Sequence, residues 1–176
     1  MTVSLFRQKE LEGVKGMVEI LLIRHGETDY NRNGVILGQT DVSLNKKGIE
    51  QGKVLKDRLK DEKIDAAYSS DLKRCVEICD LIEFDCEVKS SKNLREMDMG
   101  DWDGRDFNHV KEKFPEEYEA WKNDWVNYPV PGGESFIEMS KRVLAEFEKI
   151  RNSREEGKIA VVSHGGSIRT ILGHYI

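Results

Sequence analysis

The stretch Val18-Glu19-Ile20-Leu21-Leu22-Ile23-Arg24-His25-Gly26-Glu27-Thr28 decides the fold of this chain. It opens with a short, nearly continuous apolar run, which is typical of a β-strand buried on both faces of a parallel sheet. A polar segment that contains a glycine follows at once. In folds built on such sheets, ligands bind at the carboxyl ends of the strands, so we expect functional residues directly after Ile23.

Strands and helices alternate along most of the remaining chain. The apolar patterns predict helix 46–60, strand 64–70, helix 72–83, strand 86–88, helix 136–151, strand 159–163 and a final helix. Ser43 or Asn45 is expected to cap the first helix, and Asp71 the second. The inward face of the first helix is expected to carry its apolar residues, Ile49, Val54, Leu55 and Leu59. This order predicts a three-layer α/β/α sandwich with a mostly parallel central sheet.

One insertion interrupts this alternation, at about residues 105–131. It is helical in pattern and rich in aromatic residues, and it ends at Pro129-Val130-Pro131-Gly132-Gly133, so it predicts a small helical lid. The domain is expected to span residues 17–176. Residues 1–16 are polar and precede a second methionine, so we expect them to lie outside the domain as an N-terminal extension.

Composition narrows the range of partners. The 176 residues carry 28 Lys and Arg against 33 Asp and Glu, a net charge of −5, which argues against nucleic acid or an anionic membrane as the main partner. No apolar run reaches the roughly 18 residues of a membrane span, and the N-terminus becomes charged before a signal peptide develops, so we expect a cytoplasmic protein. The three cysteines, Cys75, Cys79 and Cys86, are expected to be reduced thiols without a metal.

Three strand ends carry unusual chemistry. They are Arg24–Thr28, Ser69–Arg74 and Ser163–Gly166. The arginine side chains offer planar donor forks that suit a phosphate group, and the glycines let backbone N–H groups approach an anion. A neutral histidine in such a place can attack phosphorus, and Glu96 is a suitable carboxylic acid for the leaving alcohol if burial raises its pKa.

Each of these features has a plainer explanation when it is taken alone. A histidine after a strand is more often structural than catalytic, and a lone arginine is usually a solvated surface charge. An Arg-His pair after one apolar strand, combined with His-Gly-Gly after another, is a much rarer arrangement.

The motifs, taken in order, resemble those of the histidine phosphatase (phosphoglycerate mutase-like) superfamily. They are Arg24-His25-Gly26-Glu27-Thr28 with Asn31, Gly38-Gln39-Thr40-Asp41 with Leu44 and Gly48, Ser69-Ser70-Asp71-Leu72-Lys73-Arg74, Leu94-Arg95-Glu96 with Gly100, Trp102 and Gly104, Pro131-Gly132-Gly133-Glu134-Ser135, and Val161-Val162-Ser163-His164-Gly165-Gly166. Together they span residues 18–172.

This resemblance implies roles for the matching residues. His25 would be the phosphorylated nucleophile, and Glu96 would donate the proton and later activate water. The phosphate pocket would be formed by Arg24, Asn31, Arg74, His164 and the Gly165 amide, with Thr28 and Gln39 as further substrate contacts. No metal and no other cofactor is expected, because no pair of carboxylates or histidines has the spacing of metal ligands. Ser70 would shape its turn, and Glu134 would cap the long helix or reach the rim of the pocket.

The chain departs from the family pattern in two places. Asp103-Gly104 stands where relatives often have Glu-Gly, which we expect to matter little, while Asp98 and Asp101 are rival carboxylates near Glu96. The chain ends at Ile176, ten residues after Gly166, where relatives commonly continue. This predicts either a C-terminus truncated relative to the functional protein or a compact member of the family.

The expected reaction is hydrolysis of a small phosphorylated metabolite. In the lid, acidic residues outnumber Lys111, Lys113 and Lys122, which favours a phosphatase over a phosphoglycerate mutase. Size and the Pro-Gly-Gly-Glu-Ser motif point to α-ribazole 5′-phosphate, and a broad-specificity phosphatase is an equal contender. The lid aromatics Trp121, Trp125 and Tyr128 could stack on a base or simply pack the lid. A non-catalytic phosphoester-binding relative is the alternative from another class, and the oligomeric state is left open between a monomer and a homodimer.

Overall fold

Within the part of the chain that the structure describes, the central sheet has five strands in the order β1-β2-β5-β3-β4. The computed structural model describes residues 3–7 and 17–175. The strands are β1 (Val3–Arg7), β2 (Val18–Arg24), β3 (Ala66–Ser70), β4 (Val88–Ser91) and β5 (Gly157–Ser163). Strands β2, β5, β3 and β4 are parallel, and β1 pairs antiparallel with β2 at one edge. The prediction of a mostly parallel sheet is confirmed.

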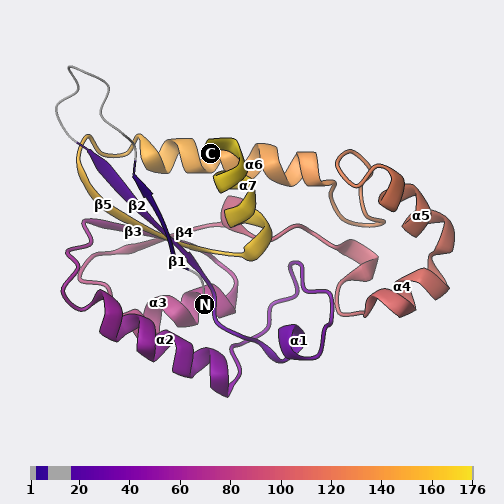
Figure 1. Cartoon of the computed structure of the whole chain (residues 1–176), viewed down its shortest axis with the longest axis horizontal. Coiled ribbons are helices and arrows are strands. Elements are labelled where there is room, and N and C mark those ends of the chain that lie inside the picture. The colour runs from indigo at the N-terminus through magenta and orange to yellow at the C-terminus, as the bar shows by residue number, and fades with distance from the viewer. Residues whose placement is uncertain (1–2, 8–16, 176) are drawn as a thin grey trace.

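Helices cover both faces of this sheet (Figure 1). The helices are α1 (Asp29–Arg32), α2 (Lys46–Leu59), α3 (Lys73–Ile82), α4 (Phe107–Lys113), α5 (Pro115–Asn123), α6 (Phe136–Arg151) and α7 (Gly165–Tyr175), with short 3₁₀ helices η1 (Lys92–Leu94) and η2 (Gly100–Trp102). Figure 1 shows α6 and α7 on one face and α2 and α3 on the other, so the three-layer sandwich is confirmed. Helices α4 and α5 project to one side, where the lid was expected. No helix in the described part of the chain is long and apolar enough to cross a membrane.

The apolar run that opened the sequence analysis is buried on both faces because its side chains alternate between two cores. Ile20 and Leu22 pack with α6 and α7, whereas Leu21 and Ile23 pack with α2 and α3. Strand β5 lies beside β2 with Ile20 opposite Ile159, so the apolar residues of both strands fall in register.

A third, smaller apolar cluster holds the lid. Its buried members are Ile36, Trp102, Val110 and Val130. Partly buried lid aromatics surround them, and the ring of Trp121 meets that of Trp102 edge-on with 5.6 Å between centroids. The lid aromatics Trp121 and Tyr118 thus pack against protein.

The N-terminal extension is described only in part. Residues Val3–Arg7 form β1, in a register that runs from Val3 opposite Ile23 to Arg7 opposite Glu19. The rest of residues 1–16 lie outside the described residues, and the domain boundary at residue 17 stays a prediction.

Several local expectations were wrong. Ile49 and Val54 are 38% and 59% exposed, and α2 instead turns Gly48, Gly52 and Leu55 inward. Strand β4 begins at Val88 rather than at Cys86. The different inward face of α2 has a physical cause: Gly48 and Gly52 let the helix approach its neighbours closely, which an apolar pattern cannot reveal.

Two predicted helix caps were also wrong. Asn45 caps α2 as expected, but Asp71 does not cap α3, whose N-cap residue Leu72 makes no side-chain bond. Helix α6 is capped by Ser135 in a capping box with Glu138, not by Glu134. Asp71 and Glu134 bind arginines instead, as described below.

Candidate active site

The carboxyl ends of β2, β5 and β3 bring the three sequence motifs together. Arg24 lies opposite Ser163 in the β2–β5 register, and the backbone N–H of His25 donates to the Ser163 carbonyl at 3.0 Å. As a result the rings of His25 and His164 lie side by side, with 5.1 Å between their centroids. Two residues about 140 positions apart in the chain thus share one site because parallel strands end at the same edge.

His25 is held in one tautomer. The residue is 6% exposed, and Nδ1 lies 2.7 Å from the carbonyl oxygen of Gly26, which can only accept, so Nδ1 carries the proton. Nε2 is therefore left with its lone pair. Burial, followed by the charge of Arg74, lowers the pKa of His25 from 6.5 to about 3. The ring is neutral at neutral pH, which is the state that a nucleophilic nitrogen requires.

His164 is buried and neutral as well. Its Nδ1 accepts the Nε–H of Arg74 at 3.2 Å, so Nε2 carries the proton and donates to Ser70 Oγ at 2.8 Å. Burial and the charge of Arg74 hold the pKa of His164 well below its ordinary value. Ser70 Oγ also accepts the backbone N–H of Leu72. The same hydroxyl therefore shapes the turn after β3 and holds the ring of His164.

Arg74 is the buried positive charge of the site. It is 0% exposed, and its two terminal nitrogens donate to the carbonyls of Gly38 and Thr40 at 2.7 and 2.8 Å. With the bond to His164, every guanidinium nitrogen has a fixed partner. Five N–H groups serve only three bonds, so two of its N–H groups make no hydrogen bond to the protein.

Asp103 holds the loop on which Arg74 rests. Its two carboxylate oxygens accept the backbone N–H groups of Gly38 at 3.0 Å and Thr40 at 2.8 Å. The same two residues turn their carbonyls toward Arg74. We expected little consequence from Asp at this position, but its carboxylate fixes two residues that contact Arg74.

Arg24 and the start of α7 face the same place. Arg24 is exposed, and a Cβ atom added to Gly165 would lie 3.4 Å from its guanidinium carbon. Gly165 is also the first residue of α7, whose N-terminus attracts negative charge. Because both histidines are neutral, the positive potential of the site comes from two arginines and a helix end.

Glu96 also lies against the start of α7. Its carboxylate accepts the backbone N–H of Gly166 at 2.8 Å and that of Met97 at 3.0 Å. A side chain at Gly166 would collide with the Glu96 carboxylate, so this approach requires glycine. The rival carboxylate Asp98 accepts the N–H of Gly100 instead.

The remaining predicted residues occupy the surrounding loops. Thr28 is completely buried, and it forms a capping box with Asn31 at the start of α1. Gln39 donates to the carbonyl of Glu96 at 3.2 Å and accepts from Arg95, which in turn is paired with Asp71. The direct contact of Thr28, Asn31 and Gln39 with a substrate stays a prediction.

The cysteines are free thiols. Cys75 lies beneath His164, with Sγ 3.5 Å from Nε2, and burial raises its pKa above the ordinary value. Within residues 3–7 and 17–175, no three His, Cys, Asp or Glu residues are grouped so that they could hold a metal ion.

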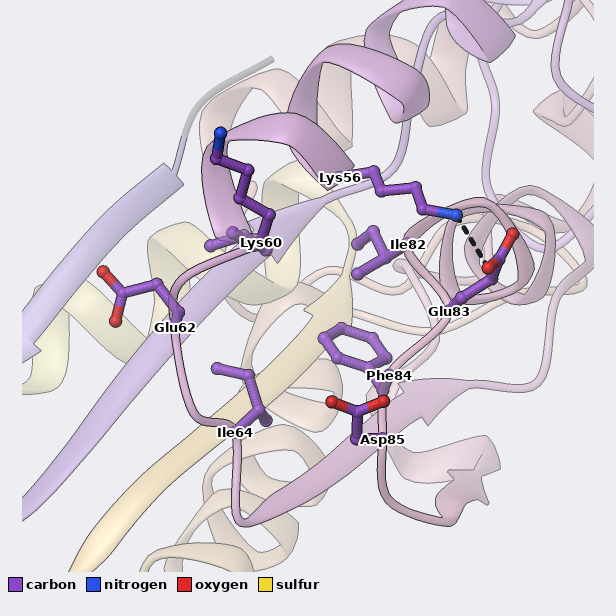
Figure 2. A pocket seen from close by; sticks show the side chains of 9 residues that line it. Lys56, Lys60, Glu62, Ile64, Ile82, Glu83, Phe84 and Asp85 are labelled. Carbon is purple, nitrogen blue, oxygen red and sulfur yellow. Dashed lines mark ion pairs between the residues drawn. The ribbon is translucent and has the colours of Figure 1, made fainter.

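A separate hollow of about 240 Å³ lies at the far ends of α2 and α3. Figure 2 shows apolar Ile64, Ile82 and Phe84 inside it and an ion pair between Lys56 and Glu83 beside it. None of the residues predicted for the active site lines this hollow. Helices α2 and α3 begin near the histidines, whereas the hollow lies where these helices end.

The buried neutral state of His25 predicts a pH dependence of stability. The unfolded chain takes up a proton on His25 near pH 6.5, whereas the folded chain does so near pH 3, so the free energy of unfolding falls as the pH drops through this interval. Between pH 6 and pH 5 we expect the wild type to lose about 1 kcal/mol more than His25→Asn. Urea unfolding at both pH values measures this difference, and equal losses in the two proteins would contradict the neutral state.

A parallel α/β sheet whose carboxyl edge gathers two neutral histidines, two arginines and a helix N-terminus defines an enzyme that handles phosphate groups. The chain belongs to the histidine phosphatase superfamily (branch 1), whose family model matches residues 20–176.

Among its relatives, the chain is 37% identical to phosphoglycerate mutase-like protein 4 of Arabidopsis thaliana over 87% of this chain and 69% of the relative. It is also 37% identical to the metal-independent phosphoserine phosphatase of the same plant, over 88% and 67% of the two chains. The crystal structure of the α-ribazole phosphatase from Shigella flexneri matches with a TM-score of 0.85 and 32% identity, over 89% of this chain and 79% of that one. The expected family is confirmed, and the chain is an enzyme of the phosphatase class.

Proposed function

We propose that the chain hydrolyses phosphomonoesters of small metabolites through a phosphohistidine formed on His25. The observation that carries the proposal is the bond from His25 Nδ1 to the Gly26 carbonyl, which leaves Nε2 unprotonated beside Arg74 and Arg24. The two arginines and the start of α7 would hold the phosphoryl oxygens.

The reaction would proceed in two displacements. His25 Nε2 attacks phosphorus, the ester P–O bond breaks, and Glu96 gives its proton to the departing alkoxide. Glu96, now a carboxylate, takes a proton from water as the water oxygen attacks phosphorus. The N–P bond then breaks, inorganic phosphate leaves, and His25 and the protonated Glu96 are restored.

We expect Glu96→Gln to reduce kcat/KM most for substrates with poor leaving groups. An alkoxide needs a proton in the transition state and nitrophenolate does not, so the loss should be about 10²-fold for glycerol phosphate and below about tenfold for p-nitrophenyl phosphate. The ratio kcat/KM is the quantity to compare because it reports on the first displacement alone. An equal loss on both substrates would mean that another group supplies the proton.

Two substrates are proposed first. α-Ribazole 5′-phosphate is favoured by the motif arrangement and by the similarity to α-ribazole phosphatase, and phosphoserine by the similarity to a metal-independent phosphoserine phosphatase. Trp121 packs in the lid cluster, whereas Trp125 packs on Phe136 with 4.8 Å between centroids and is 49% exposed.

Activity on a metabolite panel tests the proposal. The panel contains phosphoserine, α-ribazole 5′-phosphate and 3-phosphoglycerate, and the measurement is phosphate release with and without EDTA. We expect release without any metal and no transfer to a second hydroxyl. Loss of activity on EDTA addition would overturn the mechanism, phosphoglycerate isomerisation would support a mutase, and no turnover with tight binding would support a non-catalytic relative.

A further inference from the structure

One arginine outside the phosphate site binds the loop that carries Glu96. Arg142 lies on α6, and all five of its guanidinium N–H groups have acceptors. Two bonds go to the carboxylate of Glu134, and the other three go to main-chain carbonyls of Asn93, Arg95 and Glu96, at 3.1, 2.8 and 2.8 Å.

These three carbonyls belong to residues 93–96, the segment that carries the Glu96 side chain. The other carbonyl of this segment, that of Leu94, accepts from Ser163 Oγ at 2.7 Å. Arg95 also accepts from Ser167 Oγ, and Glu96 from Gln39. Four consecutive peptide groups are therefore fixed, and Arg142 is bound to three of them.

Glu134 holds the chain on the other side of Glu96. Besides holding Arg142, its carboxylate accepts the backbone N–H of Asp98 at 2.8 Å, while its own N–H donates to the Asp98 carbonyl at 3.1 Å. The side chains of Arg142 and Glu134 are 20% and 17% exposed, so solvent screens the pair only in part. The chain on both sides of Glu96 is thus tied to α6.

We propose that Arg142, with Glu134, is a positioning residue that aims the carboxylate of Glu96 at the ester oxygen. The proposal rests on the proposed function of Glu96 as the acid. Arg142 donates to the Glu96 carbonyl, whereas the Glu96 carboxylate accepts from the backbone N–H groups of Met97 and Gly166, so Arg142 acts through the backbone. A displacement of about 1 Å in a reacting group can cost up to about 10²-fold in rate.

Arg142→Lys tests this role, because lysine keeps the charge but cannot bind three carbonyls and a carboxylate in one plane. We expect kcat/KM for glycerol phosphate to fall about tenfold more than kcat/KM for p-nitrophenyl phosphate. Glu134→Gln should likewise lower kcat/KM more for glycerol phosphate than for p-nitrophenyl phosphate. This second variant replaces Arg142→Lys in the test if Arg142→Lys does not fold. The control is Arg151→Lys, the same substitution on the same helix at an arginine paired with Glu148, which should leave the ratio unchanged.

The outcomes separate this proposal from the proposed function. Suppose that Glu96→Gln changes the ratio of kcat/KM between the two substrates, whereas Arg142→Lys and Glu134→Gln lose activity equally on both. Arg142 then has a structural role only, and the positioning proposal is overturned. If Glu96→Gln itself leaves the ratio unchanged, the assignment of Glu96 as acid fails instead. A changed ratio of kcat/KM between the two substrates in Arg142→Lys and Glu134→Gln, with an unchanged melting temperature, supports positioning directly.

Discussion

Replacement of His25 by Ala is expected to abolish hydrolysis of p-nitrophenyl phosphate, with a loss of about 10³-fold or more. In the proposed mechanism the imidazole supplies the atom that attacks phosphorus, and the neighbouring His164 cannot take its place. His164 uses Nδ1 to accept from Arg74 and Nε2 to donate to Ser70, so it has no free lone pair in the plane of its ring. The measurement is steady-state release of nitrophenol at neutral pH.

The fate of the phosphoryl group provides a second readout for this variant. A labelled substrate should transfer its phosphoryl group to the wild type as an acid-labile adduct that is missing in His25→Ala. His174→Ala is the matched control, because His174 is exposed near the end of α7 and should retain full activity. Undiminished activity of His25→Ala would sink the mechanism, as would an adduct that persists in that variant.

Replacement of Arg74 by Lys is expected to reduce kcat/KM about 10²-fold and to lower the melting temperature. Lysine retains a positive charge, but one ammonium group cannot reach His164 Nδ1, the Gly38 carbonyl and the Thr40 carbonyl and also face a phosphate. At least one buried acceptor then loses its partner, which costs about 1–3 kcal/mol. The measurements are kinetics on p-nitrophenyl phosphate and thermal unfolding.

Arg58→Lys is the control for this change, because Arg58 is exposed on α2 and should tolerate lysine. The affinity for inorganic phosphate should weaken together with kcat/KM in Arg74→Lys. A variant that binds phosphate as tightly as the wild type, and is equally active, would show that the buried guanidinium contributes nothing to anion binding.

The layers of the fold could be predicted because they follow from side-chain pattern alone. A strand with apolar residues on both faces, such as β2, has to be covered on both sides, and the alternation with amphipathic helices supplies the cover. The meeting of His25, Arg74 and His164 follows from the same topology, since each comes from the carboxyl end of a parallel strand or the turn beyond it.

What the sequence could not provide is the set of contacts made by the backbone. Arg142 and Asp103 contribute through main-chain groups of distant loops, and no residue type marks a loop as the partner of such a contact. For Arg142 the sequence offers one weak sign of a structural contact: the residue lies between Met139 and Val143, at the edge of the buried face of α6. Asp71 and Glu134 look like helix caps because both precede a helix, yet each forms an ion pair with an arginine instead.

The use of carbonyl oxygens to hold Arg74 and Arg142 has an evolutionary consequence. A carbonyl is the same whichever side chain its residue carries, so residues such as Thr40 and Asn93 can be exchanged without loss of the arginine contacts. Gly38 is an exception, because a Cβ atom there would lie 2.6 Å from the Met97 carbonyl oxygen. Such a scaffold can diversify by changing side chains alone, which fits relatives that bear names as different as phosphoserine phosphatase and α-ribazole phosphatase.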